Sequence, residues 1–289
     1  MRQLGYLLGS RGAAEATKSL DDLQRAAEEF KAAGIDVLGI NGGDGTIHLT
    51  LSTFIKVYGD APFPKVAILP GGTLNTIAAG MGIRGKPQEL LYEVIDRYHQ
   101  GEDLPTVECN ALRIGDKHGF LFGNGLVANF LAAYYETGKP SPIMGAKVLF
   151  RAIASAIFRT SFAKKLFRRF VGDVVVDGKP WARRDFVTVM GGTVPEIGLG
   201  FKPFYRYREE PDHFPLLGIH CGPFGVVTDL RRIHRGKPMR RDKVISVVAK
   251  EVVLRPDEPF TYTIDGDVYT AEGELSLGIG PRLRLIRLV

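Results

Sequence analysis

Cysteine is scarce in this chain, which has only Cys109 and Cys221 among its 289 residues. Two cysteines so far apart exclude a disulfide framework and a cysteine-based zinc cluster. The six histidines are scattered and do not have the paired spacing of metal ligands. These absences indicate a protein of the reducing cytoplasm.

Long hydrophobic runs are also missing. The longest uncharged stretch, Gly119 to Tyr135, contains Asn124 and Asn129. It is shorter than the ~20 apolar residues that a membrane-spanning helix needs. The first twelve residues have too short an apolar run for a secretory signal. We therefore expect neither a targeting signal nor a membrane span.

Acidic residues are missing from one segment, although the net charge of the whole chain is only +6. Between Lys139 and Gly172 there are eight basic residues and no acid, so the rest of the chain sums to −2. A local excess of one sign indicates a local partner of the opposite sign. We expect that partner to be an anionic membrane surface and not nucleic acid.

The same basic segment is predicted to form a helix over residues 145–170. Its polar stripe is predicted to contain Arg151, Ser155 and Arg159, and its apolar stripe Leu149, Ile153 and Ile157. The phenylalanines that interleave with its basic residues are Phe158, Phe162, Phe167 and Phe170. A basic amphipathic helix of this kind docks on a membrane interface. The alternative is a solvated helix that covers a core with its aromatic side chains. A second basic run, Arg231 to Lys243, either extends this surface or is a charged loop.

The first hundred residues alternate between apolar runs and helical patterns. Ser19 followed by Asp22 resembles a capping box that starts one helix, Gly34 ends it, and Pro87 starts another. Residues 35–41 and 65–70 are apolar runs of the kind that a parallel sheet buries on both faces. Strand, glycine turn and helix follow one another twice, which predicts a doubly wound α/β domain.

From about Thr106 the chain changes to β-branched or alternating runs with Asp-Gly and Gly-Pro punctuation. This half is predicted to be largely antiparallel β-structure. We therefore expect two domains, an α/β nucleotide-binding domain over residues 1–105 and a β-rich domain over residues 106–279. The site is expected in the cleft between them.

Two glycine-rich turns, Gly42 to Thr46 and Gly71 to Asn75, each follow a predicted parallel strand and open a helix. Open α/β folds bind ligands at this carboxyl edge of the sheet. Backbone N–H groups at a helix N-terminus bind anions, and glycine lets a phosphate approach the main chain. Asp44 would repel phosphate, so it is expected to act through Mg²⁺ or on a hydroxyl. The turns predict a nucleotide or phosphate site, with a plain tight turn as the alternative.

The two turns and a late Asp-Gly-Asp together resemble the diacylglycerol kinase catalytic-domain family. That family's signatures are GGDGTxxE, PxGTxND and DGE. The matching stretches here are GGDGTIH (Gly42 to His48), LPGGTLNTIA (Leu69 to Ala78) and TIDGDVY. The resemblance runs from about Thr17 to the end of the chain. It implies a nucleotide domain of the NAD kinase and diacylglycerol kinase type, an antiparallel β-sandwich that takes the lipid, and a last strand, about residues 280–289, that returns to the first domain.

The resemblance also implies the site residues. Asp267 matches the family's proton acceptor, Asp265 is the neighbouring essential acid, and Asp44 is the third expected catalytic residue. Asp212 falls near a Mg²⁺ loop of the family. The residues expected to bind the nucleotide are Thr17, Gly42, Gly43, Asp44, Gly45, Thr46, Ile47, His48, Gly72, Thr73 and Asn75.

Three positions depart from the family signatures. Leu49 stands where the first signature has glutamate, Thr76 where the second has aspartate, and Asp267 where DGE has glutamate. Family members also have an opening strand with an NPxSG turn, whereas only 41 residues precede Gly42 here. Either Ser10 and Arg11 take the place of that turn in a compressed domain, or the sequence starts late.

These observations predict an ATP- and Mg²⁺-dependent kinase that phosphorylates the hydroxyl of a membrane lipid and associates peripherally with the membrane. Asp265 or Asp267 would accept the proton. An ordinary hairpin tip is the other interpretation of these aspartates, because Asp-Gly favours type I′ turns. The departures leave open a non-catalytic lipid- or nucleotide-binding relative. A soluble kinase of the NAD kinase type is a further alternative, although that family's second, threonine-rich motif has no counterpart here.

Overall fold

The computed structural model describes residues 12–138, 141–158, 160–240 and 242–288. The chain divides into two compact units, unit 1 with Met1–Cys109 and Pro281–Val289, and unit 2 with Asn110–Gly280. The sequence pattern places the corresponding boundaries after residues 105 and 279. Ser10 and Arg11 lie outside the described residues.

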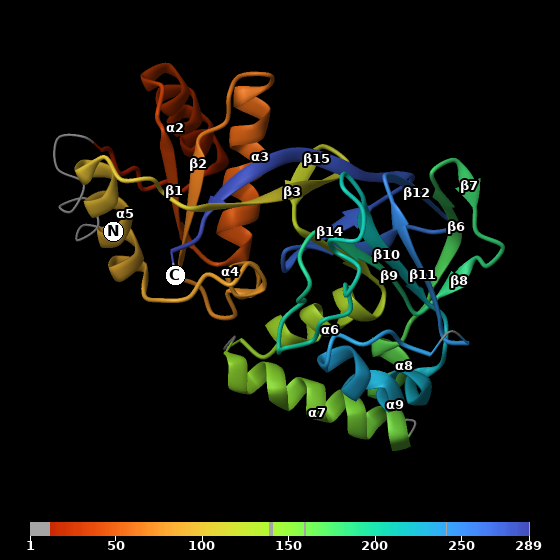
Figure 1. The fold of residues 1–289 in the computed structure, drawn as a ribbon. Coiled ribbons are helices and arrows are strands. Elements are labelled where there is room, and N and C mark those ends of the chain that lie inside the picture. Colours follow the sequence, from red (N-terminus) through yellow and green to blue (C-terminus); the bar gives the residue numbers. More distant parts are fainter. Residues whose placement is uncertain (1–11, 139–140, 159, 241, 289) are drawn as a thin grey trace. The chain divides into compact units, whose positions relative to one another are not determined.

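Unit 1 is built on a short parallel sheet (Figure 1). β1 (Val37–Gly42) pairs with β2 (Lys65–Pro70) along its whole length. β15 (Leu275–Ile286) reaches unit 1 from unit 2 and adds to the other side of β2, where Leu285 pairs in parallel with Val66. The expected return of the last strand to the first domain is confirmed.

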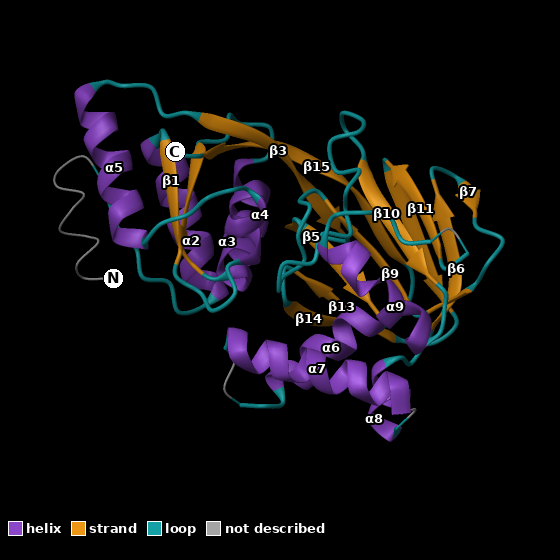
Figure 2. Ribbon diagram, turned by 60° about the horizontal axis from the view of Figure 1, so that its bottom comes forward, coloured by secondary structure: helices purple, strands orange, loops and turns teal. Residues whose placement is uncertain are grey.

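Helices cover both faces of this sheet (Figure 2). α5 (Pro87–Gln100) lies on one face, where Val94 packs with Ala67 of β2 and Ile286 of β15. On the other face α3 (Asp44–Tyr58) contacts β1 and α2 (Leu20–Ala33). The short α4 (Thr76–Gly80) follows the second glycine turn. The predicted doubly wound α/β architecture is confirmed.

The two ends of α2 follow directly from the sequence. The Ser19 Oγ accepts a hydrogen bond from the Asp22 backbone N–H at 3.1 Å, which satisfies one of the unpaired donors of the first turn. Gly34 ends the helix in the left-handed region at φ 64°, a conformation that glycine adopts without steric cost.

Unit 2 contains two sheets. The members of the first, besides β15, are β3 (Thr106–Ile114), β4 (Lys117–Gly119), β6 (Phe170–Val176), β7 (Lys179–Pro180), β8 (Asp185–Phe186) and β12 (Glu251–Pro256). The second runs in the order β11 (Val244–Ala249), β10 (Phe214–Ile219), β9 (Thr188–Gly192), β5 (Leu121–Asn124), β13 (Phe260–Ile264) and β14 (Asp267–Ala271). Every pair within this second sheet is antiparallel.

The two sheets pack face to face around one hydrophobic core. Val174 and Leu254 from the first sheet meet Val189 and Leu216 from the second in this core. The next residues along the second sheet, such as Met190 and Leu217, point to the opposite face. Neither strand order closes on itself, so the predicted antiparallel sandwich is confirmed as two open sheets.

A layer of helices covers the outer face of the second sheet. Its members are α6 (Leu126–Tyr135), α7 (Pro142–Phe158), α8 (Ser161–Leu166) and α9 (Pro223–His234). α9 packs Val226 and Ile233 against Met190 and Leu217, while α7 contacts the other three helices. Among the described residues, no helix is long and apolar enough to cross a membrane.

The prediction of a single basic amphipathic helix over residues 145–170 is wrong in its details. The segment forms α7 and α8, and Phe170 already belongs to β6, where it is buried in the core. Ser155, predicted on the polar stripe, is buried, whereas Ile157, predicted on the apolar stripe, is exposed. The buried residues of α7 are mostly small, with Ala152 and Ala156 among them, and they lie on a different side of the helix from Ile157.

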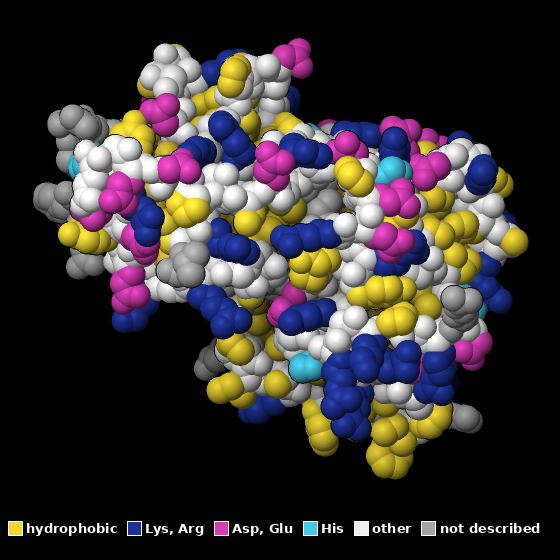
Figure 3. Space-filling model, in the orientation of Figure 1, with side chains coloured by type: hydrophobic (Ala, Val, Ile, Leu, Met, Phe, Trp, Pro, Cys, Tyr) yellow, Lys and Arg dark blue, Asp and Glu magenta, His cyan; other side chains and the backbone are white. Residues whose placement is uncertain are grey.

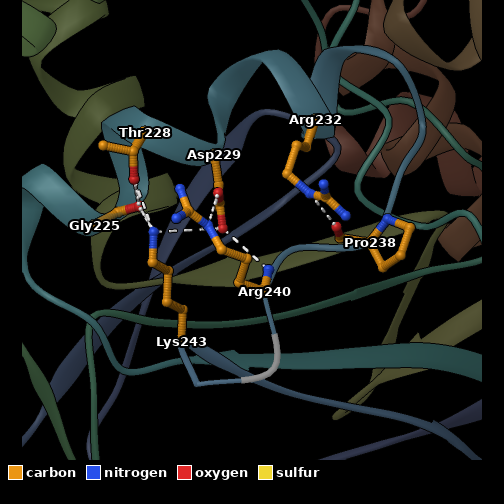
Figure 4. A network of polar contacts seen from close by, with 7 residues as sticks. All are labelled: Gly225, Thr228, Asp229, Arg232, Pro238, Arg240 and Lys243. Atoms are coloured by element: carbon orange, nitrogen blue, oxygen red, sulfur yellow. Dashed lines mark hydrogen bonds and ion pairs between the residues drawn. The ribbon is translucent and has the colours of Figure 1, made fainter.

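A buried carboxylate anchors α9 (Figure 4). Asp229 is fully buried and accepts hydrogen bonds from the backbone N–H of Arg240 at 3.0 Å and from its Nε at 2.9 Å. The ammonium of Lys243 lies 3.6 Å from the same carboxylate and donates to the Thr228 hydroxyl at 2.7 Å. Burial alone raises the pKa of Asp229, but the hydrogen bonds from Arg240 and the charges of Lys243 and Arg240 outweigh it, so this pKa lies below its ordinary value.

Candidate functional site

The expected site residues fall into two groups, one in each unit. In unit 1 the two glycine turns lie against each other. A Cβ on Gly43 would lie 3.1 Å from the Gly72 Cα, and a Cβ on Gly72 would overlap the Gly43 Cα. Glycine is required at position 72, and position 43 leaves little space for a side chain, because the two main chains approach each other closely. The turns therefore form one continuous surface, which we call the glycine cradle (residues 42–46 and 71–75).

Three hydrogen bonds hold the halves of the glycine cradle together. The Gly71 N–H donates to the Gly42 carbonyl at 2.9 Å. The Asp44 carboxylate accepts the N–H groups of Thr76 at 2.9 Å and Ile77 at 3.0 Å, the first two residues of α4. Asp44 was expected to act through Mg²⁺ or on a hydroxyl. In the structure this residue of the first glycine turn caps α4, the helix that follows the second glycine turn.

The N-terminus of α3 supplies the donors of the cradle. Its first helical hydrogen bond runs from the Ile47 N–H to the Gly43 carbonyl at 3.0 Å. The N–H groups of residues 44–46 precede that bond and have no acceptor within the helix. A helix of 15 residues adds a partial positive charge at this end. The arrangement is suited to binding an anion such as a phosphate.

The side chains around the cradle divide into exposed and enclosed ones. Thr46 and Thr73 are exposed, and Thr17 is exposed in the irregular segment before α2. Ile47 and His48 were expected to bind the nucleotide, but their side chains are buried in unit 1. Both lie on the stripe of α3 that also buries Leu51 and Phe54, so the helical period turns them toward the interior.

The side chain of Asn75 forms hydrogen bonds to the main chain within the second turn. Its amide oxygen accepts the Gly72 N–H at 2.8 Å, and its amide nitrogen donates to the Gly72 carbonyl at 3.0 Å. The residue has a left-handed backbone at φ 50°, which asparagine tolerates better than most residues. Its side chain therefore shapes the cradle from within.

In unit 2 the expected acids lie on the β13–β14 hairpin. Ile264 pairs with Asp267, so Asp265 and Gly266 form a two-residue turn, both with positive φ, of 48° and 97°. This geometry is that of a type I′ turn. The Asp265 carboxylate is buried and accepts the N–H groups of Phe120 at 3.0 Å and Leu121 at 2.8 Å. Asp265 therefore fastens the turn to the start of β5.

Asp267 is half-buried at the start of β14. Burial, together with the negative charges of Asp267 and other neighbouring groups, raises the pKa of Tyr269 to about 12, so this phenol stays protonated at neutral pH. The Tyr135 hydroxyl donates to the Gly266 carbonyl at 3.0 Å and holds the tip of the turn from α6. Asp267 is thus the acid of this hairpin that lies nearest to solvent.

The structure gives no support to Asp212 as a metal ligand. Asp212 is exposed, and Asn110 donates to its carboxylate at 3.2 Å. Within the described ranges, no three acidic, histidine or cysteine side chains gather as a metal site would require. The prediction rested on an approximate sequence position alone.

Comparison with known proteins agrees with the two signature turns. Residues 3–107 match the family model described as the diacylglycerol kinase catalytic domain. The first unit belongs to this family. The diacylglycerol kinase catalytic domain of this chain is also 30% identical over 100 residues to "Probable lipid kinase YegS" of Salmonella arizonae and 31% identical to that of Salmonella newport. Each match covers 35% of this chain and 31% of the relative, so it spans about a third of the relatives' length.

Solved structures extend the likeness of fold to both units. A putative diacylglycerol kinase from Bacillus anthracis str. Sterne gives a TM-score of 0.68 at 17% identity, covering 94% of this chain and 84% of that one. A second structure described in similar words gives a TM-score of 0.66 at 18% identity, with the same coverage. At this identity the likeness shows the fold alone.

Sequence reasoning missed the partners that hold the diacylglycerol kinase signature residues. Phe120 and Leu121 donate to Asp265 from a loop 144 or more positions earlier, which no local spacing signals. Gly119 is required there, because its Cβ would lie 2.7 Å from an Asp265 carboxylate oxygen. Tyr269 was within reach of prediction, since it follows Asp267 by two residues and strand alternation puts both on one face.

Proposed function

We propose that this chain is an ATP- and Mg²⁺-dependent kinase that transfers a phosphoryl group to the hydroxyl of a membrane lipid. The observation that carries this proposal is the glycine cradle. Its two turns pack main chain against main chain beside the N-terminus of α3. A surface of main-chain N–H groups at a helix N-terminus suits the phosphates of a nucleotide. The relatives named as lipid kinases support a lipid hydroxyl as the acceptor.

In this mechanism the cradle holds the triphosphate in place. The N–H groups of residues 44–46 bind phosphate oxygens, and the exposed hydroxyls of Thr46 and Thr73 add two more donors. Asp44 acts as a positioning residue, since its carboxylate fixes α4 and the second turn. Phosphoryl transfer depends mainly on such positioning and on charge stabilisation.

Asp267 is the proposed proton acceptor for the lipid hydroxyl. It is half-buried at the start of β14, whereas the carboxylate of Asp265 is taken up by two backbone N–H groups. Asp265 then acts as a positioning residue that fixes the turn carrying Asp267. A proton acceptor needs a carboxylate that can approach the substrate, which favours Asp267 over Asp265.

ATP and Mg²⁺ fit the residues that are present. Mg²⁺ commonly binds through one or two carboxylates together with substrate phosphates and water, so it does not need a dedicated cluster of acids. Asp44 is the acid of the cradle and would be the residue that holds the ion. Bound Mg²⁺ would offset the charge of the phosphates.

The test is transfer of labelled phosphate from ATP to diacylglycerol, sphingoid and related lipids in mixed micelles. We expect transfer that needs Mg²⁺ and that falls by about 10²- to 10⁴-fold in Asp267→Asn with little change in the KM for ATP. Asp265→Asn keeps an acceptor oxygen, so we expect a smaller loss. Equal loss in both variants together with a raised KM for ATP would contradict the roles given to them.

A non-catalytic binding protein is the second candidate function. The observation in its favour is that Asp44 and Asp265 are both hydrogen-bonded to backbone N–H groups, while Leu49 and Thr76 replace acids of the family signatures. It predicts nucleotide and lipid binding without transfer to any lipid, unaffected by Asp267→Asn. Labelled NAD, offered in the same assay, tests the NAD kinase alternative.

A further inference from the structure

The outward face of α7 is apolar, which is unusual for a surface helix. Its most exposed large side chains are Ile143 at 70%, Phe150 at 74%, Ile157 at 49% and Phe158 at 78%. Ile143, Phe150 and Ile157 follow one another at intervals of seven residues, so they lie along one line of the helix. The smaller Ala146 is exposed on the same side.

The inward face of α7 is already packed against the rest of unit 2. The exposed apolar side chains are therefore not the residues by which this helix joins the core. Gly145, Val148, Ala152 and Ala156 are buried, and they recur at helical spacing on the opposite side. α7 contacts α6, α8 and α9 through this face. The helix thus has a packed inner face and a second apolar face that contacts no other described part of unit 2 closely enough to be buried.

Basic residues flank the apolar line. Lys147 and Arg151 are exposed on α7 itself, and Arg151 stacks over the Phe162 ring at 4.2 Å. Asp and Glu are absent from α7 and α8. α9, which contacts α7, contributes the exposed Arg231 and Arg232. Figure 3 shows Lys and Arg side chains gathered over α9, with hydrophobic side chains protruding beside them over α7.

The shape and charge of this surface indicate what kind of partner binds to it. A helix of 17 residues that projects single aromatic and aliphatic side chains, with basic groups beside them, matches the boundary between acyl chains and anionic headgroups. Phenylalanine and isoleucine side chains enter the apolar layer, while lysine and arginine reach back to the phosphates. The Asp229 network holds the basic α9 in place beside α7.

We infer that the outward face of α7, with Ile143, Phe150, Ile157 and Phe158 flanked by the basic residues of α7 and α9, docks unit 2 on the surface of an anionic lipid bilayer. The inference deepens the proposed function, on which it rests for the source of the lipid substrate. It assigns membrane contact to one helix face, which lies apart from the Asp265–Asp267 turn in the sequence.

The test measures co-sedimentation of the full chain with vesicles, without ATP. Vesicles contain phosphatidylcholine alone or with an equal amount of phosphatidylglycerol. We expect binding to the mixed vesicles, and a fall in the partition coefficient of about tenfold or more in the double variant Phe150→Ser, Phe158→Ser. Phe150→Leu, Phe158→Leu should keep most of the binding. Tyr92→Ser, which removes a similarly exposed ring from α5 of unit 1, should change nothing.

Charge reversal tests the basic flank. Lys147→Glu, Arg151→Glu should weaken binding to the mixed vesicles by about fivefold or more for each residue, since an interfacial basic group contributes ~1 kcal/mol. Lys179→Glu, an exposed control on β7, should have little effect. Binding that is equal with and without phosphatidylglycerol, or that is unaffected by both sets of variants, would overturn the inference.

Two further outcomes separate this surface from other roles. If the chain dimerises without vesicles, and the Phe150→Ser, Phe158→Ser variant is monomeric with unchanged vesicle binding, the face is a contact between copies. If this variant also loses transfer to lipid dissolved in detergent, the side chains belong to the substrate site and the docking assignment is wrong. Failure of the proposed kinase activity itself would appear as absent transfer with vesicle binding intact.

Discussion

A methyl group on Gly72 would overlap the Cα of Gly43, and a methyl group on Gly43 would make a tight contact of 3.1 Å with the Cα of Gly72. Each glycine lies in a different turn, and each turn follows a different strand of unit 1. Because the two main chains are in contact, a side chain added at either glycine would push the two turns apart. The shape of the glycine cradle thus depends on the absence of a Cβ atom at these two glycines.

Gly72→Ala should therefore open the glycine cradle. We expect the rate of phosphoryl transfer to fall by about 10²-fold, because displacements of ~1 Å at a site that works by positioning have effects of this size. The KM for ATP should rise at the same time. Steady-state kinetics against ATP provide the measurement.

Gly273→Ala is the matched control for that variant, because nothing lies within 4 Å of a Cβ at residue 273. Its kinetics should equal those of the unchanged chain. Both variants should have circular dichroism spectra like that of the parent. A Gly72→Ala protein with unchanged kinetics would show that the cradle does not hold the nucleotide.

Asp44 and Asp265 show what a sequence does and does not reveal at this scale. Both residues were found from signature motifs, and the motifs directed attention to catalysis. Each carboxylate in fact receives two consecutive backbone N–H groups, from Thr76 and Ile77 or from Phe120 and Leu121. Those donors are main-chain groups of α4 and of the start of β5, far away in the sequence, so residue types at local spacing could not identify them.

At the scale of single elements, helix ends were easier to predict than helix faces. The Ser19 cap and the Gly34 stop of α2 are local features, and both are confirmed. The faces of α7 depend on what packs beneath it. Mostly small residues make its inner face, so hydrophobic periodicity alone predicted a stripe in which Leu149 and Ile153 are only half-buried and Ile157 is exposed.

α9 should respond to loss of its buried anchor. Asp229→Asn keeps the shape of the side chain but removes the charge that faces Lys243 and Arg240. We expect the free energy of unfolding at neutral pH to fall by about 2 kcal/mol, since it leaves a largely buried ammonium without its counter-charge. Urea denaturation of both proteins gives the difference.

The same anchor gives a pH dependence of defined sign. The folded-state pKa of Asp229 lies below its ordinary value of 3.8, so its stabilising contribution is present above that value. This contribution disappears as the pH falls through the lower, folded-state pKa. The difference between the parent and Asp229→Asn should therefore be constant near neutrality and shrink below pH 3.8. Asp173→Asn, at an exposed pair with Arg184, should have a much smaller effect throughout; a difference that grows in acid would contradict the assignment.

At the scale of the whole molecule, one strand belongs to both units. Residues 275–278 of β15 pair with β12 in unit 2, whereas Leu285 pairs with β2 in unit 1. The family resemblance implied this return of the chain, and the alternation of the buried Leu283 and Leu285 with the exposed Arg284 is consistent with a strand that has one buried face. The sequence contained no local signal for the partner strand, because Val66 lies more than two hundred positions away.

Two fully buried leucines of β15 should therefore report on different units. Leu285→Ala should lower the free energy of unfolding by about 3 kcal/mol and reduce hydrogen-exchange protection in β1 and β2. Leu277→Ala, on the same strand, should have a similar cost but reduce protection in β6 and β12. Hydrogen exchange followed by mass spectrometry distinguishes the two patterns. Identical patterns in the two variants would mean that β15 does not divide its contacts between the units.

The double membership of β15 also sets an order of events at the ribosome. β1 and β2 are synthesised before unit 2, whereas the part of β15 that completes unit 1 follows all 171 residues of unit 2. At ~5–20 residues per second, this interval lasts roughly 10 to 30 s. During that time one edge of β2 has unpaired backbone N–H and C=O groups, which another strand could pair with incorrectly. A chaperone or an early fold of unit 2 that delivers the strand promptly would shorten this vulnerable period.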